Sequence, residues 1–71
     1  MRGQELIHRI EKLAKRRKQT VRFEPRRGKG SHGTLFLGDR FTVIPDIRKE
    51  VKTGTLGSIL RSLGLQKSDL E

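Results

Sequence analysis

Hydrophobic residues recur at helical spacing near the start of the chain. One side of a helical wheel collects Leu6, Ile7, Ile10, Leu13 and Ala14. This spacing predicts an amphipathic helix over residues 4–17. At about 100° per residue, His8 falls opposite the apolar stripe, so we expect it to face solvent.

A period-two pattern follows the predicted helix. In "TVRFEP", Val21 and Phe23 alternate with charged residues, which predicts a half-buried strand that ends at Pro25. Further on, "GTLFL" and "RFTVI" are two apolar runs separated by Gly38-Asp39. A glycine-containing pair between two such runs is typical of a tight β-hairpin.

A two-residue turn fixes the register of this hairpin. It predicts the pairs Phe36 with Phe41, Thr34 with Val43, Leu35 with Thr42, and Leu37 with Arg40. We expect the phenylalanine face to pack against the helices. The other face then keeps Leu35, Leu37 and Ile44, which a protein partner or a second copy would cover. The alternative is a register shifted by one residue, with these three residues in the core.

A second amphipathic helix is predicted near the end of the chain, with the apolar residues Leu56, Ile59, Leu60 and Leu63. Thr55 is its expected N-cap and Gly64 its expected end. The element order is therefore α-β-β-β-α. We expect one domain over residues 1–71 with an α+β fold: a three-stranded antiparallel sheet with both helices on one face, as in double-stranded-RNA-binding domains.

Positive charge dominates the composition. The 71 residues include 17 Lys and Arg against 8 Asp and Glu, a formal net charge of +9. This excess favours nucleic acid as the partner, ahead of an anionic membrane surface or a solvated basic surface without a partner. The chain has no cysteine, no apolar run of membrane-spanning length and no signal-peptide pattern, so we expect a soluble cytoplasmic protein.

The basic residues concentrate in two segments. "KLAKRRK" at 12–18 ends the first helix, where cations complement the helix dipole, whereas "RRGK" at 26–29 stands directly before "GSHG". His32 in this glycine-rich loop is either a turn residue or a group that transfers a proton, because imidazole titrates near neutral pH. Backbone amides at 54–56, approached by Arg48, Lys49 and Lys52, form either a phosphate site or an ordinary solvated helix start.

Three features together resemble the HicA family of small bacterial toxins: "GKGSHG" after the first strand, a hairpin that ends at Pro45, and "KTGTLGSILRSLGL" near the end. The resemblance extends from the first helix through Leu65. It implies a messenger-RNA interferase of a type II toxin–antitoxin pair, inhibited by a cognate HicB-like antitoxin. The chain departs from the family pattern at Asp46 and Ile47, where many relatives carry a basic or imidazole side chain.

The resemblance also implies that His32 is catalytic. RNA supplies its own 2′-hydroxyl nucleophile, so the protein needs proton transfer, phosphate positioning and charge stabilisation. We expect RNA to contact this loop and the approach to the second helix, through Arg26, Arg27, Lys29, Gly30, Ser31, Gly33, Lys49 and Lys52. Ser31 or Lys29 could assist His32, and the sequence does not choose between them. No residues have metal-ligand spacing, which predicts cleavage without a metal or other cofactor.

Two other functions are consistent with the same residues. One is a non-catalytic module that binds double-stranded RNA, and the other is a structural basic protein that binds polyanions without selectivity. An RNA reader depends on the 2′-hydroxyl and a general polyanion binder does not.

Overall fold

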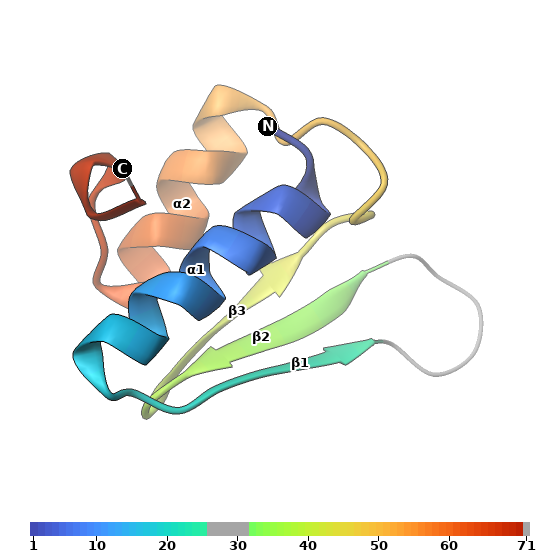
Figure 1. The fold of residues 1–71 in the computed structure, drawn as a ribbon. Helices are drawn as coiled ribbons and strands as arrows, with labels where there is room; N and C mark the ends of the chain where they lie inside the picture. Colours follow the sequence, from blue (N-terminus) through green and yellow to red (C-terminus); the bar gives the residue numbers. More distant parts are fainter. Residues whose placement is uncertain (26–31, 71) are drawn as a thin grey trace.

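The computed structural model describes residues 1–25 and 32–70. The elements follow one another as α1 (Gly3–Arg17), β1 (Val21–Pro25), β2 (Gly33–Leu37), β3 (Arg40–Ile44), α2 (Thr53–Leu63) and the short 3₁₀ helix η1 (Lys67–Leu70). The strands form an antiparallel sheet in the order β1-β2-β3, and both helices cover the same face of it (Figure 1). The predicted α+β fold is confirmed.

The hydrophobic core lies between the two helices and the covered face of the sheet. In α1 the predicted apolar stripe is buried, and His8 on the opposite side is exposed, as its position on the helical wheel predicts. From the strands and α2, the core receives Leu35, Leu37, Ile44, Ile59, Leu60 and Leu63. Burial of this aliphatic surface is the main term that stabilises the fold, and the chain has no cysteine with which a disulfide could add to it.

The hairpin has the predicted register, but the prediction of which face is covered is wrong. Phe36 pairs with Phe41, and Leu35 with Thr42, as the two-residue turn requires. The helices nevertheless cover the face of Leu35, and Phe41 is 62% exposed on the other side. The β1 pairing explains this result, because Val21 and Phe23 lie opposite Leu37 and Leu35. The covered face is therefore richer in apolar surface than the phenylalanine face.

The helix α2 begins earlier than its apolar pattern indicates. Its N-cap is Lys52, without a side-chain hydrogen bond, so the prediction of Thr55 as the cap is wrong. The first turn is exposed and carries no apolar residue before Leu56, which is why periodicity misses it. The end is as predicted: Gly64 has a φ of 72°, a left-handed conformation that glycine adopts without strain.

The connection between β3 and α2 is tied to the N-terminus of the chain. The amide of Gln4 donates to the Ile47 carbonyl at 2.9 Å, and the amide of Val51 donates to the Met1 carbonyl at 2.9 Å. An isolated β-bridge joins Arg2 to Glu50. These bonds satisfy a free amide of the first turn of α1 and fix the path of the connection as it leaves the sheet.

None of the helices in the described part of the chain combines the length and the apolar character that crossing a membrane requires.

Candidate functional site

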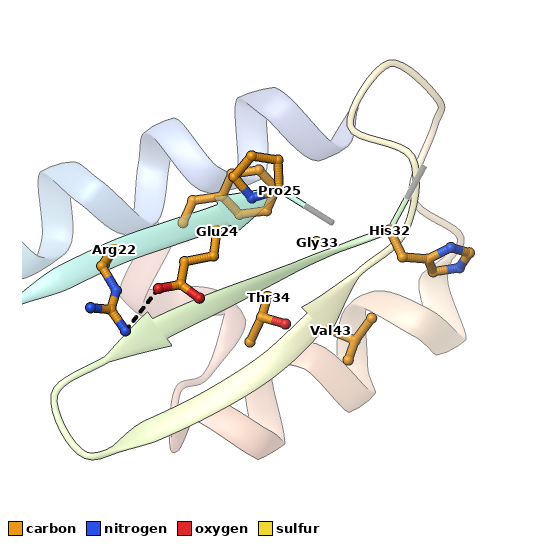
Figure 2. A pocket seen from close by; sticks show the side chains of 8 residues that line it. Arg22, Glu24, Pro25, His32, Gly33, Thr34 and Val43 are labelled. Atoms are coloured by element: carbon orange, nitrogen blue, oxygen red, sulfur yellow. Dashed lines mark ion pairs between the residues drawn. The ribbon is translucent and has the colours of Figure 1, made fainter. Parts of the chain in front are cut away.

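A hollow opens on the uncovered side of the sheet, where β1 ends and β2 begins. The described residues that line it are Arg22, Phe23, Glu24, Pro25, His32, Gly33, Thr34 and Val43 (Figure 2). Its volume of about 850 Å³ lies within the range of about 300–1,000 Å³ that is typical of ligand sites. We call this feature the β1–β2 hollow.

His32 stands at one end of the β1–β2 hollow, directly before β2. Its side chain is exposed and projects beyond the end of the strand, away from Arg22 and Glu24 (Figure 2). The pairing of Gly33 with Ile44 brings the start of β2 beside the end of β3, so Pro45 follows on the neighbouring strand. The imidazole is therefore accessible to a large ligand approaching from solvent.

Two charged residues in the hollow were not among the predicted site residues. Arg22 and Glu24 lie on β1 and form an ion pair of 3.1 Å (Figure 2). Sequence reasoning assigned them only to the polar side of a half-buried strand. The register of β1 against β2, which pairs Glu24 with Thr34, is what brings them into the same hollow as His32. The alternation of residues in β1 already placed Arg22 and Glu24 on one face of the strand. Only the register of β1 against β2 shows that this face lies beside Thr34 and the hollow.

Packing alone gives a reason for a residue without a side chain at position 33, whether or not Gly33 contacts RNA. It is buried, and a Cβ atom added there would lie 2.7 Å from Cε1 of Phe23 and 3.0 Å from the Glu24 carbonyl oxygen. A Cβ contact below 3.0 Å requires a shift of the neighbouring atoms. The Phe23 ring thus occupies the space that a side chain at position 33 would need.

The structure accounts for the two departures from the family pattern after Pro45. The Arg48 amide donates to Asp46 Oδ1 at 3.0 Å, and Arg48 Nε approaches the same oxygen at 3.4 Å. The backbone hydrogen bond is the largest cause that lowers the pKa of the Asp46 carboxyl; burial opposes it, and the Arg48 guanidinium adds to it. Ile47 packs against the core. Both residues therefore hold the connection in place.

The predicted contacts Lys49 and Lys52 lie at the approach to α2. Both side chains are exposed, and Lys52 is the N-cap residue of the helix. Neither residue is among those that line the β1–β2 hollow. The Lys49 carbonyl accepts a hydrogen bond of 3.2 Å from the Gly3 amide, which anchors the backbone and leaves the ammonium group in solvent.

Five predicted site residues lie outside the described residues: Arg26, Arg27, Lys29, Gly30 and Ser31. The other basic segment, at 12–18, is described. Its cations at the end of α1 include Lys15, Arg16 and Arg17, and Arg17 Nη2 pairs with Asp69 of η1 at 2.8 Å. Of this segment, Arg17 therefore has a structural role in joining η1 to α1.

Within residues 1–25 and 32–70, no three His, Cys, Asp or Glu side chains lie together in a way that could hold a metal ion.

The fold and the hollow define a class of protein: a small, strongly basic α-β-β-β-α domain with an exposed histidine at the edge of an open sheet. A family model described as the HicA toxin of bacterial toxin–antitoxin systems matches residues 3–65. This match covers most of the 71 residues, and the chain belongs to the HicA toxin family. It is accordingly a toxin of the toxin–antitoxin type.

No curated protein and no solved structure matched the chain significantly.

Proposed function

We propose that this toxin is an endoribonuclease that cleaves messenger RNA in the cytoplasm, and that His32 transfers a proton in the reaction. The observation that carries the proposal is the position of His32. In a chain of the HicA family, the "GSH" histidine is exposed at the end of a hollow on the open face of the sheet. An RNA strand can reach its imidazole without displacing any helix.

The reaction requires only groups that RNA and the protein supply. The 2′-oxygen of a ribose attacks the adjacent phosphorus, a new 2′-O–P bond forms, and the bond from phosphorus to the 5′-oxygen of the next nucleotide breaks. The products are a 2′,3′-cyclic phosphate and a 5′-hydroxyl. His32 either accepts the proton of the 2′-hydroxyl or donates one to the leaving 5′-oxygen. No metal ion takes part in these steps.

Phosphate binding would come from the basic residues around His32. Arg26, Arg27 and Lys29 immediately precede it in the sequence. Arg22 also brings a guanidinium to this hollow, but its ion pair with Glu24 offsets that charge, so we assign phosphate binding to the other basic residues. In this proposal Lys49 and Lys52, together with the N-terminus of α2, bind a more distant phosphate of the same strand.

The test of the reaction class is RNA cleavage in the presence of EDTA. We expect unmodified RNA to be cut and to carry cyclic-phosphate ends, whereas RNA with 2′-O-methyl groups at every nucleotide stays intact. Cleavage of the methylated RNA would contradict attack by the 2′-oxygen. Loss of cleavage with EDTA, restored by a divalent cation, would contradict the metal-independent reaction.

A non-catalytic RNA-binding module remains the second candidate. It is consistent with the formal net charge of +9 and with the α-β-β-β-α element order, which double-stranded-RNA-binding domains share. In this case the purified protein binds RNA and leaves it intact under every condition of the same assay.

The family also implies an antitoxin partner, which we propose covers His32 and so blocks access of RNA to the hollow. A cognate antitoxin, HicB-like, is then expected to protect RNA once it is present in equal amount with the toxin. If the complex cleaves RNA as fast as the free toxin, the antitoxin does not act at this site.

A further inference from the structure

The uncovered face of the sheet carries an aromatic pair beside the β1–β2 hollow. Phe36 on β2 and Phe41 on β3 are cross-strand partners, with ring centroids 6.1 Å apart and ring planes tilted by 40°. The Arg22 guanidinium lies 4.7 Å from the centroid of Phe36. Phe41 is 62% exposed and Val43 is 54% exposed, and they are the large hydrophobic residues that remain exposed in the described part of the chain.

We propose that this aromatic pair is a stacking platform for unpaired bases of the RNA that is cut at His32. Unpaired bases stack on exposed aromatic side chains, and sheet-borne aromatics opposite a helical layer are one established way to bind them. The identity of the ligand as RNA rests on the proposed function. The platform is a separate claim about where the nucleotides beside the scissile bond lie.

The strand geometry connects the platform to His32. Side chains alternate between the two faces of β2, so Thr34 and Phe36 share the open face, and the same alternation continued back reaches position 32. Four residues at about 3.3 Å each separate positions 32 and 36 by about 13 Å. Thr34 and Val43 line the hollow between them. A nucleotide near the cleaved bond can therefore reach the aromatic rings along one continuous surface.

The charge of this surface favours bases over phosphates. Among the described strand residues of this face, the charged ones are Arg22 and Glu24, and they form an ion pair with each other. A neutral, aromatic surface suits the flat and uncharged face of a base, whereas phosphates are better placed along the basic residues around it.

The size of the apolar patch also favours bases over a protein partner. Phe36, Phe41 and Val43 form the patch, and the Arg22 guanidinium lies over the Phe36 ring. A stable protein interface buries about 800 Å² on each partner, from some 20 residues or more. Three apolar side chains are enough for one or two stacked bases, whereas a protein interface of that size would also have to include many of the polar residues around them.

Base stacking can be measured without any cleavage by using short single-stranded oligodeoxyadenosine as the probe. DNA lacks the 2′-hydroxyl, so the probe stays intact, and every base has a face that stacks. We expect Phe41→Ala to weaken its binding by at least about fivefold, the lower end for loss of one stacked base. Phe41→Leu, which keeps an apolar side chain without an aromatic face, is expected to weaken it as well. Phe41→Tyr is expected to retain it.

Tryptophan fluorescence can show directly whether a base stacks at position 41. The chain contains no tryptophan, so Phe41→Trp introduces a single reporter on the platform. His8→Trp is its matched control, because His8 is exposed on α1, away from the sheet. We expect the oligonucleotide to quench the fluorescence at position 41 and to leave that at position 8 largely unchanged. Thermal melts of all variants check that each one folds.

Three results would overturn the platform. The first is equal affinity of Phe41→Ala and the wild-type protein for the single-stranded probe, and the second is quenching at position 8 in place of position 41. The third is a change of oligomeric state in Phe41→Ala with unchanged oligonucleotide binding, which would make the face a contact between protein chains. If the protein cleaves no RNA at all, the proposed function fails, while quenching at position 41 still decides whether the platform exists.

Discussion

The two faces of the sheet are both apolar, yet they differ in what covers them. The covered face carries aliphatic residues such as Leu35 and Ile44, both fully buried beneath the helices. The open face carries Phe36, Phe41 and Val43 together with the Arg22–Glu24 ion pair. The difference separates stability from binding: one face holds the fold together, and the other keeps aromatic and charged groups exposed beside His32.

The first prediction sharpens this comparison by truncating one residue on each face. Leu35→Ala is expected to lower the free energy of unfolding by about 2–5 kcal/mol, because it leaves a cavity in the core. Val43→Ala, at an exposed position of the neighbouring strand, is expected to cost less than about 1 kcal/mol. Urea unfolding of the two variants measures both values. Similar losses would mean that the open face is buried in solution.

The second prediction concerns Gly33, where the covered face and the hollow meet. Gly33→Ala is expected to destabilise the protein by about 1–3 kcal/mol, because its Cβ must displace the Phe23 ring. The double variant Gly33→Ala with Phe23→Leu tests this cause, since the smaller side chain removes the clash. The single substitution should then cost less in the Phe23→Leu background. An equal cost in both backgrounds would contradict the packing explanation.

The smallest expected effect lies outside both faces, in the turn after Pro45 that packs against the start of α1. The Arg48 amide lowers the pKa of Asp46 in the folded protein, so the stability that Asp46 contributes is present above its ordinary pKa of 3.8. This contribution is lost as the pH falls through the lowered pKa. The stability difference between the wild-type protein and Asp46→Asn should therefore shrink on acidification. A difference that stays constant with pH would contradict this origin.

Much of the fold could be predicted from the sequence because local signals were strong. The apolar stripe of α1 and the Gly38-Asp39 turn predicted the helix and the hairpin register correctly. The covered face was not predictable from the hairpin alone, since both of its faces are apolar. Only the pairing of Phe23 with Leu35 shows to which face of the sheet β1 adds its apolar side chains.

The candidate site was predictable only in part. His32 stood out because it lies in a glycine-rich loop after a basic segment, and the structure places it at the hollow. Arg22 and Glu24 were missed because their place in the hollow depends on the β1–β2 register, which no short turn specifies. The first turn of α2 was missed because its residues 53–55 are exposed and carry no apolar pattern.

The central claim is that His32 at the edge of the open face performs chemistry, and the chain offers a matched control for it. His8, the other of its two histidines, is exposed on α1, on the side away from the sheet. His32→Ala and His8→Ala therefore remove the same group from two exposed positions. Neither change is expected to alter the free energy of unfolding by more than about 0.5 kcal/mol.

The decisive measurement is the initial rate of RNA cleavage by the wild-type protein and these two variants, without added metal and with a thermal melt of each. We expect His32→Ala to lose about 10²–10⁴-fold in rate with an unchanged melting temperature and undiminished RNA binding, and His8→Ala to cleave at the wild-type rate. Cleavage by His32→Ala at the wild-type rate would contradict the account. So would a lost rate that is accompanied by a large fall in melting temperature, because His32 would then be structural.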